Sequence, residues 1–308
     1  MKVKLRERFI SKKKYNDWMW GYIMIAPLMI GITCFYFIPF FQNIFFSFTD
    51  LNSFGKWNFV GIENYVKILK DREVWEAFRN TAYFTIVSVP TSICVSILIA
   101  YLLNKKIKGR AIYRTLFFLP VVTMPAAVGM IWRWLFNGDY GIINFFLKKI
   151  SIEGPYWLVD PRYAIYAVII VAIWSSVGYH MVIFLAGLQA IPQIYYEAAD
   201  IDGASFFTKF FKITLPLLTP SIFFVLVISM ITSFQLFDLI IMMVPSAIGG
   251  ANVALQQTQS IVFLFYKNAF VFGDRGYATA ISIILFLAIL IITIIQNSFH
   301  RKWVTYDL

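Results

Sequence analysis

Residues 197–220 read EAADIDGASFFTKFFKITLPLLTP, and this polar segment decides how the chain is organised. It lies between the fourth and the fifth of six long apolar stretches, and glycine and proline punctuate it. Pro192, just before it, suits the first turn of a helix, where the missing N–H would be unpaired anyway. Gly203 allows a sharp bend of the backbone. The sequence therefore predicts two short helices, joined at Gly203, on one side of a membrane.

The first of these helices, over residues 192–201, has two distinct sides. The helical period places Tyr196, Ala199 and Asp200 on one side, whereas Glu197 and Ala198 face elsewhere. Small side chains at Ala198 and Ala199 permit another surface to approach closely. The two interpretations are an ordinary helical hairpin that links two spans and a contact site for another protein.

The second helix is unusually aromatic. Asp202 or Ser205 can cap its start, and Pro216 is expected to break it at the membrane surface. Its four phenylalanines are too many for a solvated face and must pack on the rest of the chain or on another protein. They are Phe206, Phe207, Phe210 and Phe211.

Composition identifies the class of protein. The chain has 308 residues, of which 60% are hydrophobic and 14% charged, against about 45–50% and roughly 25% in soluble domains. Cys34 and Cys94 both lie in apolar stretches, and no Cys/His metal spacing exists. Nucleotide, metal and nucleophile motifs are missing from the sequence. We expect a membrane protein with no catalytic residue, no metal site, no cofactor and no ATPase of its own.

A membrane-spanning helix needs about 20 mostly apolar residues. The first stretch is too long for a signal-peptide core and is interpreted as a retained helix. The expected fold is an all-α polytopic membrane protein with one transmembrane domain over 18–303, a basic tail at 1–17, a connector at 189–216 and a tail at 304–308. The six expected spans are Trp18–Phe41, Thr81–Leu103, Ile112–Phe136, Tyr163–Leu188, Leu217–Val244 and Tyr277–Phe299.

Basic residues predict the orientation of these spans. Of the 27 lysines and arginines, 16 lie in the N-terminal tail, around the second and third spans, in the connector and at the C-terminus. The positive-inside rule places these segments in the cytoplasm, and six spans bring both termini to that side. The net charge of +11 is therefore explained by topology. A nucleic-acid partner, which would need the charge gathered on one surface, is not expected.

The segment between the first two spans contains apolar residues at roughly helical spacing. They are Tyr65, Val66, Leu69, Val74 and Phe78. The favoured interpretation is a short helix in the headgroup region. The alternative is an element that gates the outer mouth or contacts an external partner.

Hydroxyl residues gather in the fourth and fifth spans. Ser175, Ser176 and Tyr179 share one side of the fourth, and three residues share a face of the fifth: Ser229, Thr232 and Ser233. Such residues often join helices to one another in membranes. A transported polar solute also needs hydrogen bonds of this kind, and the two groups flank the connector.

Two further polar residues follow in the fifth span. Gln235 and Asp238 continue the polar character around that helix. A carboxylate within a span is costly and functional by default. Asp238 is expected near the outer end, where it pairs with a partner chain or lines the outer end of a pathway.

At the connector the chain resembles a known family. Glu197-Ala198-Ala199, Asp202-Gly203-Ala204 and Ile213-Thr214-Leu215-Pro216 match the EAA motif of ABC-importer permeases, spacing included. Further stretches resemble the carbohydrate-uptake branch, the MalF/UgpA-like permeases, and together they cover about residues 20–300. These are FVGIENY (59–65), RNTAYFT (79–85), YRTLFFLP (113–120), LAGLQAIP (185–192) and GYATAIS (276–282).

The resemblance implies a type I ABC-importer permease architecture. Glu197 would make polar contacts with a cytoplasmic ATPase, Gly203 would form the turn, and Ala198, Ala199 and Ala204 would keep the contact close. Asp202, Leu215 and Pro216 complete the motif. Ser176, Tyr179, Ser229, Thr232 and Ser233 would contact the solute, with Gln235 and Asp238 further along the pathway. One departure is Ala251 after Gly249-Gly250, where the family often has proline.

The implied partners are a second permease subunit, ATPase subunits that hold ATP and Mg²⁺, an extracytoplasmic solute-binding protein, a carbohydrate and the lipid bilayer of a bacterial cytoplasmic membrane. A permease for a related solute such as a glycerol phosphate is the alternative within the family. An ion-coupled secondary carrier would show internal repeats and buried ion-site carboxylates, and a membrane-embedded enzyme would need a nucleophile with a base or a metal cluster. The sequence shows none of these features.

Overall fold

The structure is a computed structural model that describes residues 18–105, 107–245, 253–300 and 304. The predicted basic tail, nearly all of the C-terminal tail and the Gly249–Ala251 departure lie outside these residues. Apart from two isolated β-bridges, the described part of the chain is helical and contains no strand. It has four helices that are long and apolar enough to cross a membrane, or six if each of two bent pairs counts as one span. The expected all-α, multi-pass membrane fold is confirmed.

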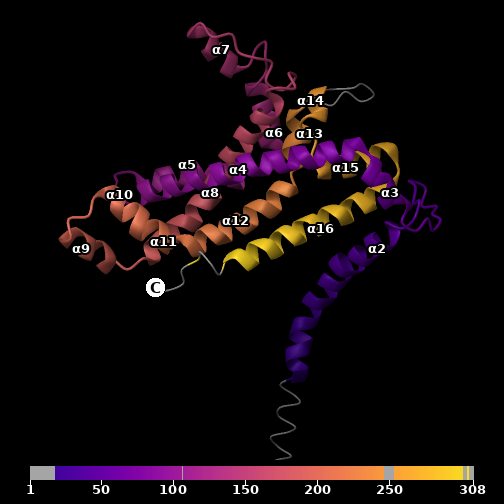
Figure 1. Ribbon diagram of the computed structural model, residues 1–308, viewed down its shortest axis with the longest axis horizontal. Coiled ribbons are helices and arrows are strands. Elements are labelled where there is room, and N and C mark those ends of the chain that lie inside the picture. Colours follow the sequence, from indigo (N-terminus) through magenta and orange to yellow (C-terminus); the bar gives the residue numbers. More distant parts are fainter. Residues whose placement is uncertain (1–17, 106, 246–252, 301–303, 305–308) are drawn as a thin grey trace, which may run out of the picture.

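Four long helices form the body of the molecule (Figure 1). They are α4 (Arg72–Asn104), α8 (Ala164–Ala190), α12 (Thr219–Phe234) and α16 (Arg275–His300). Figure 1 shows them side by side, with the connector helices at one end and α3 (Glu63–Lys70) and α15 (Ile261–Tyr266) at the other. We call these the connector end and the far end.

The packing of α4 against α8 forms the centre of the bundle. At the connector end, Val89, Ile97, Met181 and Phe184 belong to one buried cluster, which α12 completes with Val225. Ser96 Oγ on α4 also donates to the Val177 carbonyl of α8, at 3.3 Å. Small and hydroxyl side chains let membrane helices approach closely, so α4, α8 and α12 form the rigid frame on which the site is built.

The first span stands apart from the bundle. Its helix runs over Trp18–Phe46 and includes a π-helical segment, η1 (Thr33–Phe37), before α2 (Ile38–Phe46). Figure 1 shows that it leads away from the other helices. Near the C-terminal end of this first span, Asn43 Nδ2 donates to Ser282 Oγ of α16 at 2.6 Å.

The third predicted span is not one helix. It consists of α5 (Arg110–Val122) and α6 (Pro125–Leu135), which meet at an angle of 101°. Pro120 lies inside α5, whereas Pro125 begins α6, and Thr123 and Met124 between them are extended. The two prolines therefore flank a complete break between the helices, and the short α7 (Ile142–Lys149) follows α6.

The fifth predicted span is also broken. α12 ends at Phe234, and α13 (Asp238–Met243) is a separate short helix that packs on α6. A continuous helix over Leu217–Val244 was therefore a wrong expectation. Gln235 lies in the break and Asp238 begins the next helix, and these two polar residues were interpreted as part of one continuous span.

The expected headgroup helix is two helices. Its first part is α3, and Val74 and Phe78 belong to the first turns of α4, which begins with Asp71 as its cap: the Glu73 N–H donates to Asp71 Oδ1 at 2.8 Å. Ile68 and Val74 are buried with residues of α15 and α16. This segment therefore packs on the far end of the bundle through Ile68 and Val74, whereas Val66 and Leu69 are exposed.

Candidate functional site

The connector folds as a helical hairpin. α9 (Ile194–Ile201) ends at Asp202, and Gly203 then turns the chain with a φ of +69°. Few residues other than glycine adopt this left-handed conformation readily. The Ala204 N–H donates to the Ala199 carbonyl at 2.9 Å and closes the end of α9. The bend predicted at Gly203 is present.

The two sides of α9 have the expected orientation. Ala199 is buried, and the Tyr196 hydroxyl shares a hydrogen bond of 2.9 Å with Thr214 Oγ1, so this side faces the second helix of the hairpin. Asp200 is on the same side, where it is exposed and forms an ion pair with Lys209 of the second helix. Glu197 and Ala198 are exposed on the other side.

The second helix of the hairpin runs through α10 (Phe206–Lys209), η2 (Phe210–Thr214) and α11 (Leu215–Leu217). It is capped by Ser205, whose Oγ accepts from the Thr208 N–H at 3.3 Å. The chain bends by 63° after Leu217, so the break expected at Pro216 occurs one residue later.

Two of the four phenylalanines attach this hairpin to α4. The rings of Phe206 and Phe210 pack edge-on against Tyr101, with centroids 5.5 and 5.3 Å away, and Lys105 Nζ lies 4.9 Å from the centroid of Phe206. Phe207 and Phe211 are exposed, at 68% and 59%. Packing on the rest of the chain therefore accounts for Phe206 and Phe210, whereas Phe207 and Phe211 remain exposed.

Hydroxyl side chains from three helices surround a cavity of about 240 Å³ in the bundle. α4 contributes Ser88 and Ser92, α8 contributes Ser175, Ser176 and His180, and α12 contributes Ser229, Thr232 and Ser233. Apolar residues complete the wall: Phe84, Val89, Ala172, Leu236 and Leu239. The structure thus brings together four of the predicted pathway residues, which are Ser176, Ser229, Thr232 and Ser233.

The other three predicted pathway residues do not line this cavity. Tyr179 lies on α8 but is 40% exposed. Gln235 is the exposed residue that ends α12. Asp238 begins the separate helix α13 and is exposed, so it is not a carboxylate enclosed within a continuous span. A carboxylate in the first turn of a helix interacts favourably with the helix dipole.

The polar atoms of the cavity are only partly satisfied. His180 Nε2 shares a hydrogen bond of 3.1 Å with Ser229 Oγ, and Ser176 Oγ donates to the Ile173 carbonyl at 3.1 Å. Three buried atoms have no hydrogen-bond partner among the described residues: Ser88 Oγ, Ser175 Oγ and His180 Nδ1. Buried polar groups are nearly always bonded, so these atoms indicate a place for a polar molecule.

Sequence reasoning did not assign Ser88, Ser92 or His180 to the pathway. Ser88 and Ser92, with Ser96, recur every four residues along the second apolar stretch, which is the spacing of one helix face. This stripe could have identified the face of α4. His180 lies four residues after Ser176 on the same face of α8.

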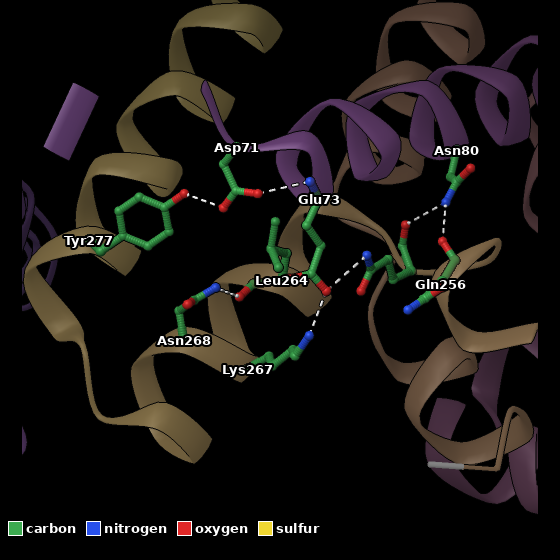
Figure 2. Close-up of polar contacts among 9 residues, drawn as sticks. Asp71, Glu73, Asn80, Gln256, Leu264, Lys267, Asn268 and Tyr277 are labelled. Carbon is green, nitrogen blue, oxygen red and sulfur yellow. Dashed lines mark hydrogen bonds and ion pairs between the residues drawn. The ribbon is translucent and has the colours of Figure 1, made fainter. Parts of the chain in front are cut away.

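A polar cluster holds the far end of the bundle together (Figure 2). The Tyr277 hydroxyl of α16 donates to Asp71 Oδ2 at 2.6 Å, and Lys267 of η3 (Lys267–Phe272) forms an ion pair of 2.5 Å with Glu73. Asn80 Nδ2 donates to the Gln256 carbonyl, at 2.9 Å, in α14 (Val253–Gln256). The cluster connects the start of α4 to three segments that follow α13, and the sequence gave no sign of it.

Replacing Glu73 with glutamine is expected to lower the free energy of unfolding by about 1–2 kcal/mol, because a charge-assisted contact is lost. The side chains of Glu73 and Lys267 are only 33% and 29% exposed. Thermal unfolding in detergent measures the effect. The matched control is Glu63→Gln, which breaks an exposed pair with Lys67 (3.0 Å, side chains 56% and 57% exposed) and should change stability little. Equal effects of the two variants would contradict the structural role of the cluster.

This chain is similar to known proteins over most of its length. Residues 92–305 match the model of the family described as "Binding-protein-dependent transport system inner membrane component". The chain is 35% identical over 302 residues to a probable ABC transporter permease, YesP, of Bacillus subtilis, covering 96% of this chain and 95% of that protein. It is also 35% identical to the trehalose/maltose transport system permease MalF of Thermococcus litoralis, covering 94% and 97%.

A further relative and a solved structure extend the comparison. The sn-glycerol-3-phosphate permease UgpA of Agrobacterium fabrum is 32% identical, covering 92% of this chain and 96% of that protein. The crystal structure of a bacterial alginate ABC transporter in complex with an alginate pentasaccharide-bound periplasmic protein contains a chain that superposes with a TM-score of 0.83, at 23% identity, covering 94% of this chain and 96% of the other. The superposition supports the fold.

Proposed function

The chain belongs to the family of binding-protein-dependent transport system inner membrane components, and from this premise we propose that it is the permease subunit of an ATP-driven importer of a carbohydrate. The observation that carries the proposal is the exposed Glu197–Ala198 edge of α9, on a hairpin whose other side is fixed to the bundle. The hairpin lies within the residues that match the family.

We propose that the hairpin is the contact site of a cytoplasmic ATPase. Within the described residues the Glu197 carboxylate makes no ion pair or hydrogen bond, so it is available to a partner. Asp202 and Gly203 are also exposed, whereas Ala199 and Leu215 face the chain itself. ATP and Mg²⁺ would be held by the partner, and this chain would supply no catalytic residue.

The hairpin is connected to the cavity through three helices, so its movement can change the shape of the cavity. α8 leads directly into α9, α11 leads into α12, and Tyr101 connects the hairpin to α4. These are the three helices whose hydroxyl groups line the cavity. A displacement of the hairpin therefore changes all of its polar walls together, which is what alternating access to a solute site requires.

The remaining parts of the proposal concern partners and placement. A second permease subunit would complete the pathway, and an extracytoplasmic binding protein would deliver the solute. The hairpin and both termini would lie in the cytoplasm, in agreement with the distribution of lysine and arginine, and the membrane would be the bacterial cytoplasmic membrane. The names of relatives that carry trehalose, maltose and glycerol 3-phosphate support a carbohydrate or a closely related polar solute.

Uptake by proteoliposomes tests this function. Vesicles that contain this chain, its companion permease and the ATPase should accumulate solute only when ATP and the loaded binding protein are present. Vesicles that lack the ATPase should show none. Uptake by this chain alone, driven by a proton or sodium gradient, would instead assign it to the secondary carriers.

A further inference from the structure

The polar lining of the cavity is rich in hydroxyl groups and holds atoms that need a partner. Ser88 and His180 are each only 5% exposed, yet Ser88 Oγ and His180 Nδ1 have no hydrogen-bond partner in the described structure. Ser175 Oγ is a third such atom on the same cavity. They come from α4 and α8, which pack against each other and form adjacent walls of the cavity. A molecule bound in the cavity would satisfy polar atoms of both helices.

These three groups can form hydrogen bonds with the hydroxyl groups of a bound molecule. A serine hydroxyl both donates and accepts, and a neutral imidazole does one at each nitrogen. Because Nε2 of His180 is already bonded to Ser229 Oγ, its Nδ1 can complement either a donor or an acceptor according to the tautomer. Each hydroxyl group of a polyhydroxylated solute can both donate and accept a hydrogen bond. Such a solute therefore complements the serine hydroxyls, and it complements His180 Nδ1 in either tautomer.

The charge of the lining separates two classes of carbohydrate. Among the described residues that line the cavity there is no aspartate, glutamate, lysine or arginine. A phosphate or carboxylate held against this wall would find no counter-charge on this chain, and burial of a charge without one is strongly unfavourable. Hydroxyl groups suffer no such loss when they are hydrogen-bonded.

We infer that the solute is an uncharged, polyhydroxylated carbohydrate, and that Ser88, Ser175 and His180 contact it in this chain's part of the pathway. The inference rests on the proposed importer function and narrows it, because it excludes phosphorylated and carboxylated solutes. Ser88 extends the solute site to α4, and it acts as a specificity-determining residue together with the two groups on α8.

The experiment has two stages with the complete importer. Thermal shift of its binding protein is measured first against maltose and trehalose as neutral probes, and against sn-glycerol 3-phosphate and an alginate pentasaccharide as anionic probes, and then against wider sets of both classes. ATP-driven uptake of the solute that binds is measured next in proteoliposomes. Ser88→Ala and Ser175→Ala are each expected to raise the KM for uptake about fivefold. The matched control is Ser298→Ala on α16, whose hydroxyl donates to the Ile294 carbonyl within its own helix at 2.9 Å.

An uncharged carbohydrate with these KM increases, and a control that behaves as wild type, is the expected result. Uptake of an anionic carbohydrate would overturn the inference while leaving the importer function intact. A neutral solute with wild-type KM in both serine variants would overturn the assignment of the contacts. If no solute is taken up in an ATP-dependent way, the proposed function itself fails, and the inference fails with it.

Discussion

Replacement of Gly203 with valine is expected to reduce ATP-driven uptake strongly while the chain still inserts in the membrane. Gly203 has a φ of +69°, and a Cβ built on it would meet no atom within 4 Å. The effect is therefore one of backbone conformation and not of collision. A β-branched residue is a genuine outlier at this φ, and the strain is about 1–3 kcal/mol. The hairpin relieves it by changing the turn, which displaces α9 and Glu197 from the position that the ATPase would bind. We expect at least about a tenfold loss of uptake.

The matched control for this variant is Gly203→Asn. Asparagine tolerates the left-handed conformation far better than valine, so it should retain most of the uptake. Co-purification of the ATPase with the tagged chain gives a second readout. Glu197→Lys, which reverses an exposed charge without changing the turn, should also lose the ATPase. Normal co-purification with both Gly203→Val and Glu197→Lys would show that the hairpin is not the contact site.

The positions of the long helices could be predicted because hydrophobicity and length determine them. The breaks within two spans could not. Pro120 is accommodated inside α5, whereas Pro125 starts a new helix at 101° to it. Both residues are prolines. Their effects differ because the backbone at Thr123 and Met124 is extended and separates α5 from Pro125. The break between α12 and α13 contains neither glycine nor proline. It is accompanied by contacts between distant segments, because the Ser260 hydroxyl donates to the Leu236 carbonyl within the break and α13 packs on α6.

The residues that line the cavity could be predicted only in part, because sequence spacing gives the face of one helix but not its contacts with other helices. Spacing within one helix placed Ser229, Thr232 and Ser233 on a common face, and the structure brings them to the cavity. Spacing cannot say which face of another helix lies opposite. Ser88 belongs to the site because α4 packs on α8, a contact between segments far apart in the sequence. Tyr179 was chosen for its distance from Ser175 along α8, but the polar face of that helix is centred on Ser176 and His180.

The close approach of α5 and α8 leads to the second prediction of large effect, for Gly178. A Cβ at this position would lie 2.0 Å from the Phe117 carbonyl oxygen and 3.0 Å from the Phe118 Cα. Both are backbone atoms, which cannot rotate away as a side chain can. Small residues allow membrane helices to pack at such distances. Gly178→Val should therefore separate α5 from α8, at a cost of about 3 kcal/mol or more, and little folded chain should be recovered in detergent.

A series of glycines on other helices and faces shows whether this effect comes from the backbone contact. At Gly187, also on α8, a Cβ would lie 2.4 Å from Ser221 Oγ and 2.8 Å from Leu218 Cδ1, which are ends of side chains that can move. Gly31, in the first span, has no atom within 4 Å. Alanine at residues 178, 187 and 31 should give a large, a small and no loss of the unfolding temperature, measured with the size-exclusion profile of each purified variant. If Gly178→Ala is as stable as Gly31→Ala, α5 and α8 do not meet at this point. In that case, packing of α5 on α8 could not be the contact that fixes α5. It would then not explain how the bend of 101° after α5 places α6 against α13.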